Sequence, residues 1–243
     1  RHAEYNEGVF VGYRYYDKKE MAVRYPFGHG LSYTTFEYSD IKLSDTAVGD
    51  DDILTVNVVI TNTGNCAGKE IVQLYVADKS GFAVRPEKEL KDFIKIELQP
   101  GERKTVTFRL DKRAFSYYNE ELGDWYAPNG KYDIMIASSS RDIRLTAEVT
   151  HKTAVKLPFV ATENTVFGEF MDYAEGKATI DLLFSKVAKG LLGGDHFEPE
   201  AVRSMIGSMP LRQIRSFGGI SDELLHQAVD MLNKDFGGFK AQM

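Results

Sequence analysis

Between residues 36 and 149, apolar and polar residues alternate in short runs, which is the pattern of β-strands with one buried face. In one run Leu54, Val56 and Val58 would point to one side of a strand, while Thr55 and Asn57 would point to the other. Seven such runs occur, over residues 36–41, 54–60, 72–76, 94–98, 106–110, 132–136 and 143–149. The pattern therefore predicts a mainly β domain over residues 36–150.

Turn-forming residues separate these runs. Asn62-Thr63-Gly64-Asn65 follows the second run, and Pro128-Asn129-Gly130 precedes the sixth. Pro100-Gly101 lies between the runs 94–98 and 106–110, so we expect these two strands to form a hairpin. About seven short strands with such frequent turns predict an immunoglobulin-like or fibronectin type III-like β-sandwich.

After residue 150 the apolar spacing becomes that of helices. Apolar residues recur at helical intervals over 180–191, and Pro199 suits the first turn of a second helical segment. Ser221 is the predicted N-cap of a third helix, which Gly237-Gly238 would end. We therefore expect four parts: a linker segment over 1–35, the sandwich over 36–150, a second linker over 151–165 and a small α-helical region over 166–243.

Composition narrows the class of protein. The chain has 243 residues, and its hydrophobic share of 43% is enough to build a packed core, which excludes disorder throughout. Its 36 acidic and 30 basic side chains give a net charge of -6, and without a Lys/Arg block this argues against nucleic acid as a partner. No apolar run approaches the roughly 18–20 residues that cross a bilayer, so we expect a soluble chain with no membrane partner.

The start of the chain and its single cysteine bear on two questions: whether the chain is part of a longer polypeptide, and in which compartment it is found. The chain begins without methionine and soon enters strand-like sequence, so we expect a piece of a longer polypeptide. Cys66 alone allows no disulfide framework within the chain. This slightly favours a reducing compartment such as the bacterial cytoplasm over secretion, but it leaves localisation open.

Several long motifs point to a known family. Residues 5–17 read YNEGVFVGYRYYD and residues 25–36 read YPFGHGLSYTTF. Further motifs are NTG at 62–64, GKEIVQLYV at 68–76, RPEKELK at 85–91 and SSSRDI at 138–143. Their order and spacing over residues 5–149 resemble glycoside hydrolase family 3, the family of many β-glucosidases and β-xylosidases. The resemblance implies the C-terminal part of such an enzyme, with a fibronectin type III-like domain, and the helical tail looks like an extension of some bacterial members.

The resemblance also implies what the parent protein does in carbohydrate metabolism. Family members hydrolyse terminal β-glucosyl or related residues with retention, without an organic cofactor. They use an aspartate nucleophile on a barrel domain and a glutamate acid/base on an α/β domain, and retention needs the two carboxyls about 5 Å apart. This chain resembles neither domain. We therefore expect no catalytic, cofactor-binding or metal-binding residue in it, and a structural role with the parent's barrel and α/β domains as partners and oligosaccharide bound through the parent.

Residues of the two N-terminal motifs are the candidates for a domain interface. Arg14 lies among tyrosines, where a guanidinium can stack on rings and clamp a carboxylate. His29 lies between two glycines, which indicates a tight backbone path rather than a metal ligand. The candidate interface residues are Glu7, Arg14, Tyr16, Phe27, Gly28, His29, Gly30 and Tyr33.

Other features leave an alternative open. Gly123-Asp124-Trp125 superficially resembles the family's nucleophile motif, but its place between a bend and a turn favours packing. Asp50-Asp51-Asp52 lacks the spacing of a calcium loop and is expected to be a solvated loop. Tyr117, Tyr118 and Tyr126 could form a carbohydrate platform or could pack against a neighbouring domain. The alternative function is therefore a carbohydrate-binding or protein-association module, with the helical tail as a route to a homo-oligomer.

Overall fold

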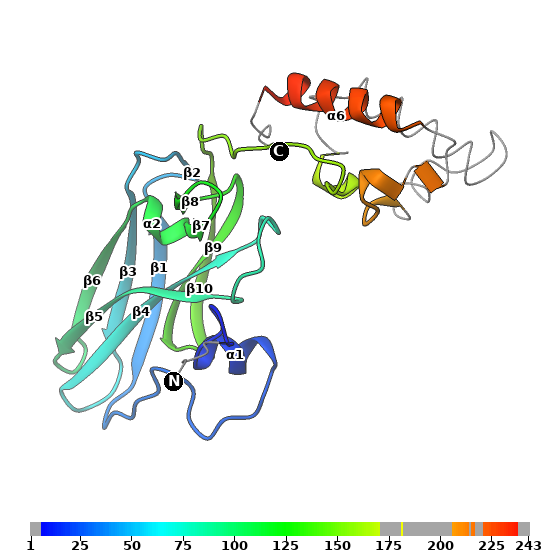
Figure 1. Ribbon diagram of the computed structural model, residues 1–243. Helices are drawn as coiled ribbons and strands as arrows, with labels where there is room; N and C mark the ends of the chain where they lie inside the picture. Colours follow the sequence, from blue (N-terminus) through cyan, green and yellow to red (C-terminus); the bar gives the residue numbers. More distant parts are fainter. Residues whose placement is uncertain (1–5, 171–180, 182–205, 214, 217–220, 238–243) are drawn as a thin grey trace, which may run out of the picture. The chain divides into compact units, whose positions relative to one another are not determined.

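The computed structural model describes residues 6–170, 181, 206–213, 215–216 and 221–237, and it divides the chain into two compact units (Figure 1). The first unit spans Arg1–Ala154 and the second Val155–Met243. Each unit is described by itself. No helix among the described residues is long and apolar enough to span a bilayer.

The first unit is a β-sandwich, so the predicted mainly β class is confirmed. One antiparallel sheet has the strand order β1-β3-β6, and the second has the order β2-β10-β9-β4-β5, in which only β2 pairs in parallel (Figure 1). The strands are β1 (Phe36–Leu43), β2 (Ala47–Val48), β3 (Leu54–Asn62), β4 (Gly68–Asp78), β5 (Glu89–Leu98), β6 (Arg103–Leu110), β9 (Gly130–Ser139) and β10 (Asp142–His151). A small hairpin of β7 (Tyr117–Asn119) and β8 (Asp124–Tyr126) and the short helices α1 (Tyr13–Lys18) and α2 (Lys112–Phe115) complete it.

The core lies between the two sheets. Leu54, Val56 and Val58 of β3 are fully buried, and Leu74 and Ile136 meet them from the opposite sheet in the same apolar cluster. Each such side chain contributes roughly 1.5–3 kcal/mol when it leaves water. All seven predicted runs form strands because the period-two pattern gives each of them one face to bury.

The predicted hairpin of residues 94–98 and 106–110 is wrong. β5 pairs with β4, whereas β6 pairs with β3, so the turn at Pro100-Gly101 carries the chain from one sheet to the other. Asn62 fixes this crossing. Its side-chain nitrogen donates to the Leu98 carbonyl at 3.1 Å and to the Cys66 carbonyl at 2.7 Å, and its own backbone carbonyl accepts from the Gly101 amide at 2.9 Å.

The second unit has a separate apolar core. It contains an isolated bridge between Val166 and Pro210, two short 3₁₀ turns, η1 (Phe167–Glu169) and η2 (Leu211–Gln213), and the helix α6 (Asp222–Phe236). As predicted, Ser221 caps α6 by accepting from the Leu224 amide at 3.3 Å, and Gly237 ends the helix in the left-handed conformation.

Two sequence expectations bear on the second unit. Phe159 and Ala161, which lie within the expected linker 151–165, belong to the buried core of this unit together with Leu232. The division between the two units lies after Ala154, so most of these linker residues fall in the second unit. The helix expected over 180–191 and the start of the segment after Pro199 lie outside the described residues, apart from Asp181.

Candidate functional site

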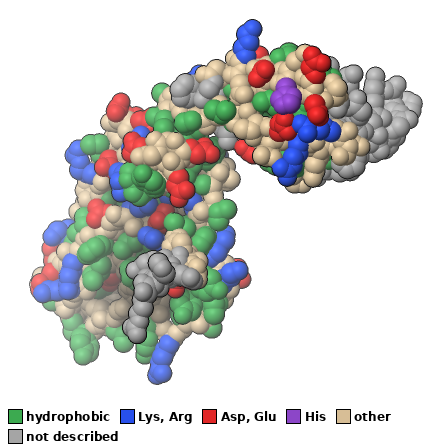
Figure 2. Space-filling model, viewed as in Figure 1, with side chains coloured by type: hydrophobic (Ala, Val, Ile, Leu, Met, Phe, Trp, Pro, Cys, Tyr) green, Lys and Arg blue, Asp and Glu red, His purple; other side chains and the backbone are tan. Residues whose placement is uncertain are grey.

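The N-terminal segment, defined as residues 6–35, exposes many large apolar side chains. Figure 2 shows hydrophobic side chains exposed at the lower end of the unit that holds the sandwich. Such a concentration of exposed apolar surface typically marks an interaction site. The exposed large hydrophobic residues of the segment are Val9, Val11, Tyr15, Tyr16, Met21, Tyr25, Phe27, Leu31 and Tyr33.

The opposite side of the segment packs on the outer face of the five-stranded sheet. The Tyr13 ring stacks on Phe27 with centroids 4.6 Å apart and meets the edge of Tyr75 at 6.1 Å. The Tyr13 hydroxyl accepts a hydrogen bond from the Leu90 amide of β5 at 2.8 Å. Tyr75 is fully buried beneath this contact, and burial raises the pKa of its hydroxyl. Residues 72–77 of β4 are therefore buried on both faces, by the core on one and by the N-terminal segment on the other.

Gln73 of β4 ties the segment to the sheet where the segment passes Gly28. Its side-chain nitrogen donates to the Gly28 carbonyl at 3.1 Å and to the Ser138 carbonyl at 2.6 Å, while its oxygen accepts from Tyr75. Gly28 has φ 76°, and a Cβ atom here would collide with the Gln73 amide. Gly30, in contrast, faces open space. The close approach to Gln73 therefore requires glycine at position 28 but not at position 30.

A buried carboxylate on α1 joins the segment to two other loops. Asp17 Oδ1 lies 2.7 Å from Arg141 Nε, and Asp17 Oδ2 lies 3.2 Å from Lys88 Nζ. Arg141 also donates to the carbonyls of Met21 at 2.8 Å and Tyr16 at 3.3 Å. One guanidinium in the β9–β10 turn therefore holds both the end of α1 and the chain that follows it.

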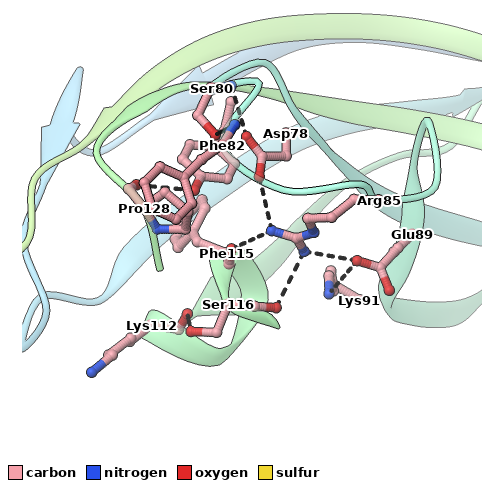
Figure 3. A network of polar contacts seen from close by, with 11 residues as sticks. Asp78, Ser80, Phe82, Arg85, Glu89, Lys91, Lys112, Phe115, Ser116 and Pro128 are labelled. Carbon is pink, nitrogen blue, oxygen red and sulfur yellow. Dashed lines mark hydrogen bonds and ion pairs between the residues drawn. The ribbon is translucent and has the colours of Figure 1, made fainter. Parts of the chain in front are cut away.

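A second ionic cluster surrounds Arg85, as Figure 3 shows. Its side chain is 8% exposed and donates to Asp78 at 3.1 Å, to Glu89 at 2.8 Å, and to the carbonyls of Phe115 at 2.7 Å and Ser116 at 3.2 Å. The guanidinium thus uses its planar fork to bind two carboxylates and the end of α2 at once.

Glu89 extends this cluster to the N-terminal segment. Arg14 Nη2 lies 3.5 Å from its carboxylate and Lys91 Nζ lies 3.3 Å away, so both cations face the same carboxylate. Burial works to raise the pKa of Glu89, but Lys91, Arg85 and Arg14 outweigh burial, and the pKa is lowered. Burial also lowers the pKa of Lys91, against the attraction of Glu89.

The remaining candidate interface residues face outward. Glu7 is exposed, and its carbonyl accepts from the Phe10 amide at 3.0 Å. The rings of Tyr16 and Tyr15 meet edge to face at 6.1 Å, and His29 stacks on Tyr25 at 5.3 Å. Tyr33 is fully exposed.

A groove of about 990 Å³ adjoins this outward face. It lies between residues 26–36 and the outer ends of strands from both sheets, and its polar lining includes Tyr38, Glu70 and Arg144. Burial raises the pKa of the Glu70 carboxyl and of the Tyr38 hydroxyl beside it. Exposed Leu31 and Tyr33 also line the groove. The polar groove therefore lies directly beside the exposed apolar surface.

The three tyrosines considered as a sugar platform do not share one exposed surface. Tyr126 is 4% exposed and meets Tyr117 edge to face at 6.0 Å, whereas Tyr118 is half exposed. The neighbouring Trp125 has the Arg113 guanidinium 3.5 Å from its ring centroid and the Tyr118 ring against it at 5.6 Å. The guanidinium thus covers one face of the indole.

The Asp50–Asp52 loop is not solvated throughout, which corrects the expectation for Asp50. Asp50 Oδ2 accepts from the Thr153 hydroxyl at 2.6 Å and from the Ala154 amide at 3.1 Å, while Asp51 and Asp52 are exposed. Within the described residues, no group of three or more His, Cys, Asp or Glu side chains is arranged to hold a metal ion.

Comparisons with known proteins show which proteins the chain is similar to. Residues 70–140 match the fibronectin type III-like domain. The chain is 45% identical over 232 residues to the thermostable β-glucosidase B of Acetivibrio thermocellus, covering 95% of this chain and 31% of that protein. The chain matches the C-terminal portion of glycoside hydrolase family 3 β-glucosidases, which carries the fibronectin type III-like domain.

Other relatives match a shorter stretch. An exo-α-(1→6)-L-arabinopyranosidase of Bifidobacterium breve is 45% identical over 169 residues, which cover 70% of this chain and 22% of that protein. The crystal structure of a β-glucosidase from Bifidobacterium adolescentis superposes with a TM-score of 0.62 at 43% identity, covering 69% of this chain and 24% of that chain. The chain thus spans about a third or less of these relatives, and the match to the Acetivibrio thermocellus enzyme extends into the second unit of this chain.

Reasoning from the sequence missed the ionic clusters. Arg85, Lys88 and Glu89 lie in the RPEKELK motif, and Arg141 lies in the SSSRDI motif, so these motifs carried the signal. The carboxylate that Lys88 and Arg141 share could not be assigned, because Asp17 is far from both motifs in sequence.

Proposed function

We propose that this chain is the non-catalytic structural portion of a family 3 glycoside hydrolase, and that it supports the parent's barrel and α/β domains. The observation that carries the proposal is the two-sided N-terminal segment. One side is fixed to the sandwich by Tyr13, Asp17 and Gln73, and the other side exposes a row of large apolar side chains. An apolar surface held so firmly is suited to packing against a neighbouring domain.

The sandwich would support catalysis by keeping the parent's two catalytic carboxyls at the correct separation. A retaining glycosidase needs its two carboxyls about 5 Å apart, and misplacement by about 1 Å can cost on the order of a hundredfold in rate. Arg14 and Asp17 fix α1 to the sandwich, and α1 in turn carries exposed Tyr15 and Tyr16. The sandwich would thus brace the catalytic domains without contributing a reacting group.

The parent's substrate is proposed only as a class. The relatives are named β-glucosidases and exo-α-(1→6)-L-arabinopyranosidases, so the family resemblance supports exo-acting hydrolysis of terminal β-D-glucosyl or related residues. The sugar and the linkage would be chosen by the parent's catalytic domains.

A direct test assays this chain alone on an aryl β-D-glucoside. We expect no turnover. Turnover that disappears when a residue of this chain is changed would contradict the proposal, because the chain would then hold a reacting group of its own.

A second test replaces the matching part of the Acetivibrio thermocellus β-glucosidase B with this chain. We expect an active hybrid in which Leu31→Ser and Tyr33→Ser together lower kcat and thermal stability. Ile53→Ser is the matched control, since Ile53 is also an exposed apolar residue but lies outside the N-terminal segment. Equal effects of the two changes would remove the support for a docking surface.

The alternative function is carbohydrate binding or protein association. Half-exposed Tyr118 favours the first, and exposed Met231 on α6 favours the second. Quenching of Trp125 fluorescence by oligosaccharides would support carbohydrate binding, because this is the chain's single tryptophan. A mass that rises with concentration would support association into a homo-oligomer.

A further inference from the structure

His151, the last residue of β10, is a buried titratable group that the proposed function does not use. It is fully buried in the first unit. The Phe115 ring of α2 stacks on the imidazole with centroids 5.6 Å apart, and the Tyr132 ring of β9 meets it edge to face at 6.2 Å. An imidazole between two aromatic rings is stable when neutral and costly when charged.

The polar groups around His151 do not compensate a charge. Nε2 lies 4.0 Å from Asp50 Oδ1, too far for a hydrogen bond, and neither ring nitrogen has a partner with hydrogen-bond geometry in the described part of the chain. Lys112 Nζ lies 3.7 Å from the same Asp50 oxygen and competes for it. Asp52 and the Pro128 carbonyl also face the ring. Burial lowers the pKa of His151, Asp50 opposes this shift, and Lys112 adds to it.

The residues after His151 are held by the same carboxylate. Asp50 Oδ2 accepts from the Thr153 hydroxyl at 2.6 Å and from the Ala154 amide at 3.1 Å. The Lys152 amide donates to the Val48 carbonyl at 2.9 Å, where two-residue β2 pairs with the end of β10. The Thr153 amide also donates to Asn129 Oδ1 at 2.7 Å, so contacts with Asp50, Val48 and Asn129 hold residues 152–154, with which the first unit ends.

We propose that His151 and Asp50 form an acid-sensitive clasp that holds residues 151–154 closed at neutral pH and opens them on acidification. In the closed state the neutral imidazole is buried between the rings of Phe115 and Tyr132. When β2 and the end of β10 separate, the imidazole reaches water and takes up a proton from solvent. Opening frees Thr153 and Ala154 from Asp50 and so loosens the chain that leads into the second unit.

The direction of the pH dependence follows from the coupling between opening and proton binding at His151. The pKa of His151 is lowered in the closed state, so the open state binds more protons at mildly acidic pH. Stability of the clasp is therefore full above the ordinary histidine pKa of about 6.5 and falls below it.

The test measures amide hydrogen exchange of Lys152, Thr153 and Ala154 in the full chain between pH 7.5 and 5.0, corrected for the intrinsic pH dependence of exchange. We expect protection to fall by up to about tenfold per pH unit below pH 6.5. Protection that stays level, or that rises because protonated His151 pairs with Asp50 in place, would overturn the proposal.

Variants separate the clasp from general acid sensitivity. His151→Phe keeps an aromatic ring at this position without a titrating group and should abolish the pH dependence, whereas His29→Phe, at an exposed histidine of the same unit, should retain it. Asp50→Asn should lower protection of the Ala154 amide, which donates to Asp50, already at pH 7.5. Should His151→Phe fail to fold, the NMR titration of His151 in the unchanged chain decides, since a midpoint at or above 6.5 would refute the clasp.

Discussion

Asp17 and Arg141 lie 124 positions apart in the sequence, yet Arg141 Nε donates to Asp17 Oδ1 at 2.7 Å. The Asp17 side chain is 6% exposed and the Arg141 side chain 32%. This contact joins the N-terminal segment to the β9–β10 turn, and Lys88 adds a second cation to the same carboxylate. The relationship explains how a segment with little regular structure is fixed on the sandwich.

Asp17→Asn should destabilise the first unit by about 2 kcal/mol, less than the roughly 3–5 kcal/mol typical of breaking a fully buried pair because Arg141 is partly exposed. The change leaves two cations facing a neutral amide. Urea unfolding followed by circular dichroism measures the loss. Arg103→Met, which removes an exposed ion pair with Asp40, is the control and should change stability by less than about 0.5 kcal/mol.

Arg85→Met should cost about 3–5 kcal/mol, because two carboxylates and two carbonyls lose their shared donor in a buried site. Arg85→Lys should restore little of this loss, since one ammonium cannot reproduce the planar fork. Thermal unfolding of the three proteins checks both expectations. A lysine variant as stable as the unchanged chain would show that charge alone matters here.

The lowered pKa of Glu89 predicts a dependence of stability on acid. A carboxyl whose folded pKa lies below its ordinary value of 4.5 contributes stability that is complete above that pH and is lost as the pH falls through the folded value. Urea midpoints between pH 7 and 3 should therefore fall more steeply for the unchanged chain than for Glu89→Gln. Parallel curves would show that Glu89 does not contribute to the acid response.

Gly28→Ala should destabilise the first unit by about 1–3 kcal/mol, because φ 76° is unfavourable for alanine and the added methyl meets the Gln73 amide. Gly30→Ala is the matched control, since its Cβ would face open space. Exposure of the N-terminal segment to limited proteolysis should increase in the first variant only. Equal behaviour of the two would contradict the close approach seen at Gly28.

Leu232→Ala should lower the stability of the second unit by about 2–5 kcal/mol, because the leucine is fully buried in that unit's core. Met231→Ala, at the adjacent and exposed position, should change it by less than about 0.5 kcal/mol. Hydrogen exchange of α6 amides reports on this unit separately from the sandwich. Equal losses of stability in the two variants would contradict the structure, in which Leu232 faces the core and Met231 faces solvent.

The sequence by itself determined the seven long strands of the sandwich and the side of each that faces the core, but it did not predict the short strands β2, β7 and β8. The alternation of Leu54, Val56 and Val58 leaves only one arrangement that removes them from water. The ends of α6 were equally evident, because Ser221 and Gly237 satisfy backbone groups within a few residues of themselves. The family motifs likewise marked the N-terminal segment and the charged loops that contact it.

Only the tertiary structure decided which strands are neighbours and which charges meet. Alternation is a local property, so it cannot tell whether the turn at Pro100-Gly101 folds β6 back on β5 or carries it across to β3. The pairing of Asp17 with Arg141 and the burial of His151 between Phe115 and Tyr132 likewise depend on where the chain returns after many residues. Those contacts arise from packing two sheets and a covering segment together, and no short stretch of sequence contains the information.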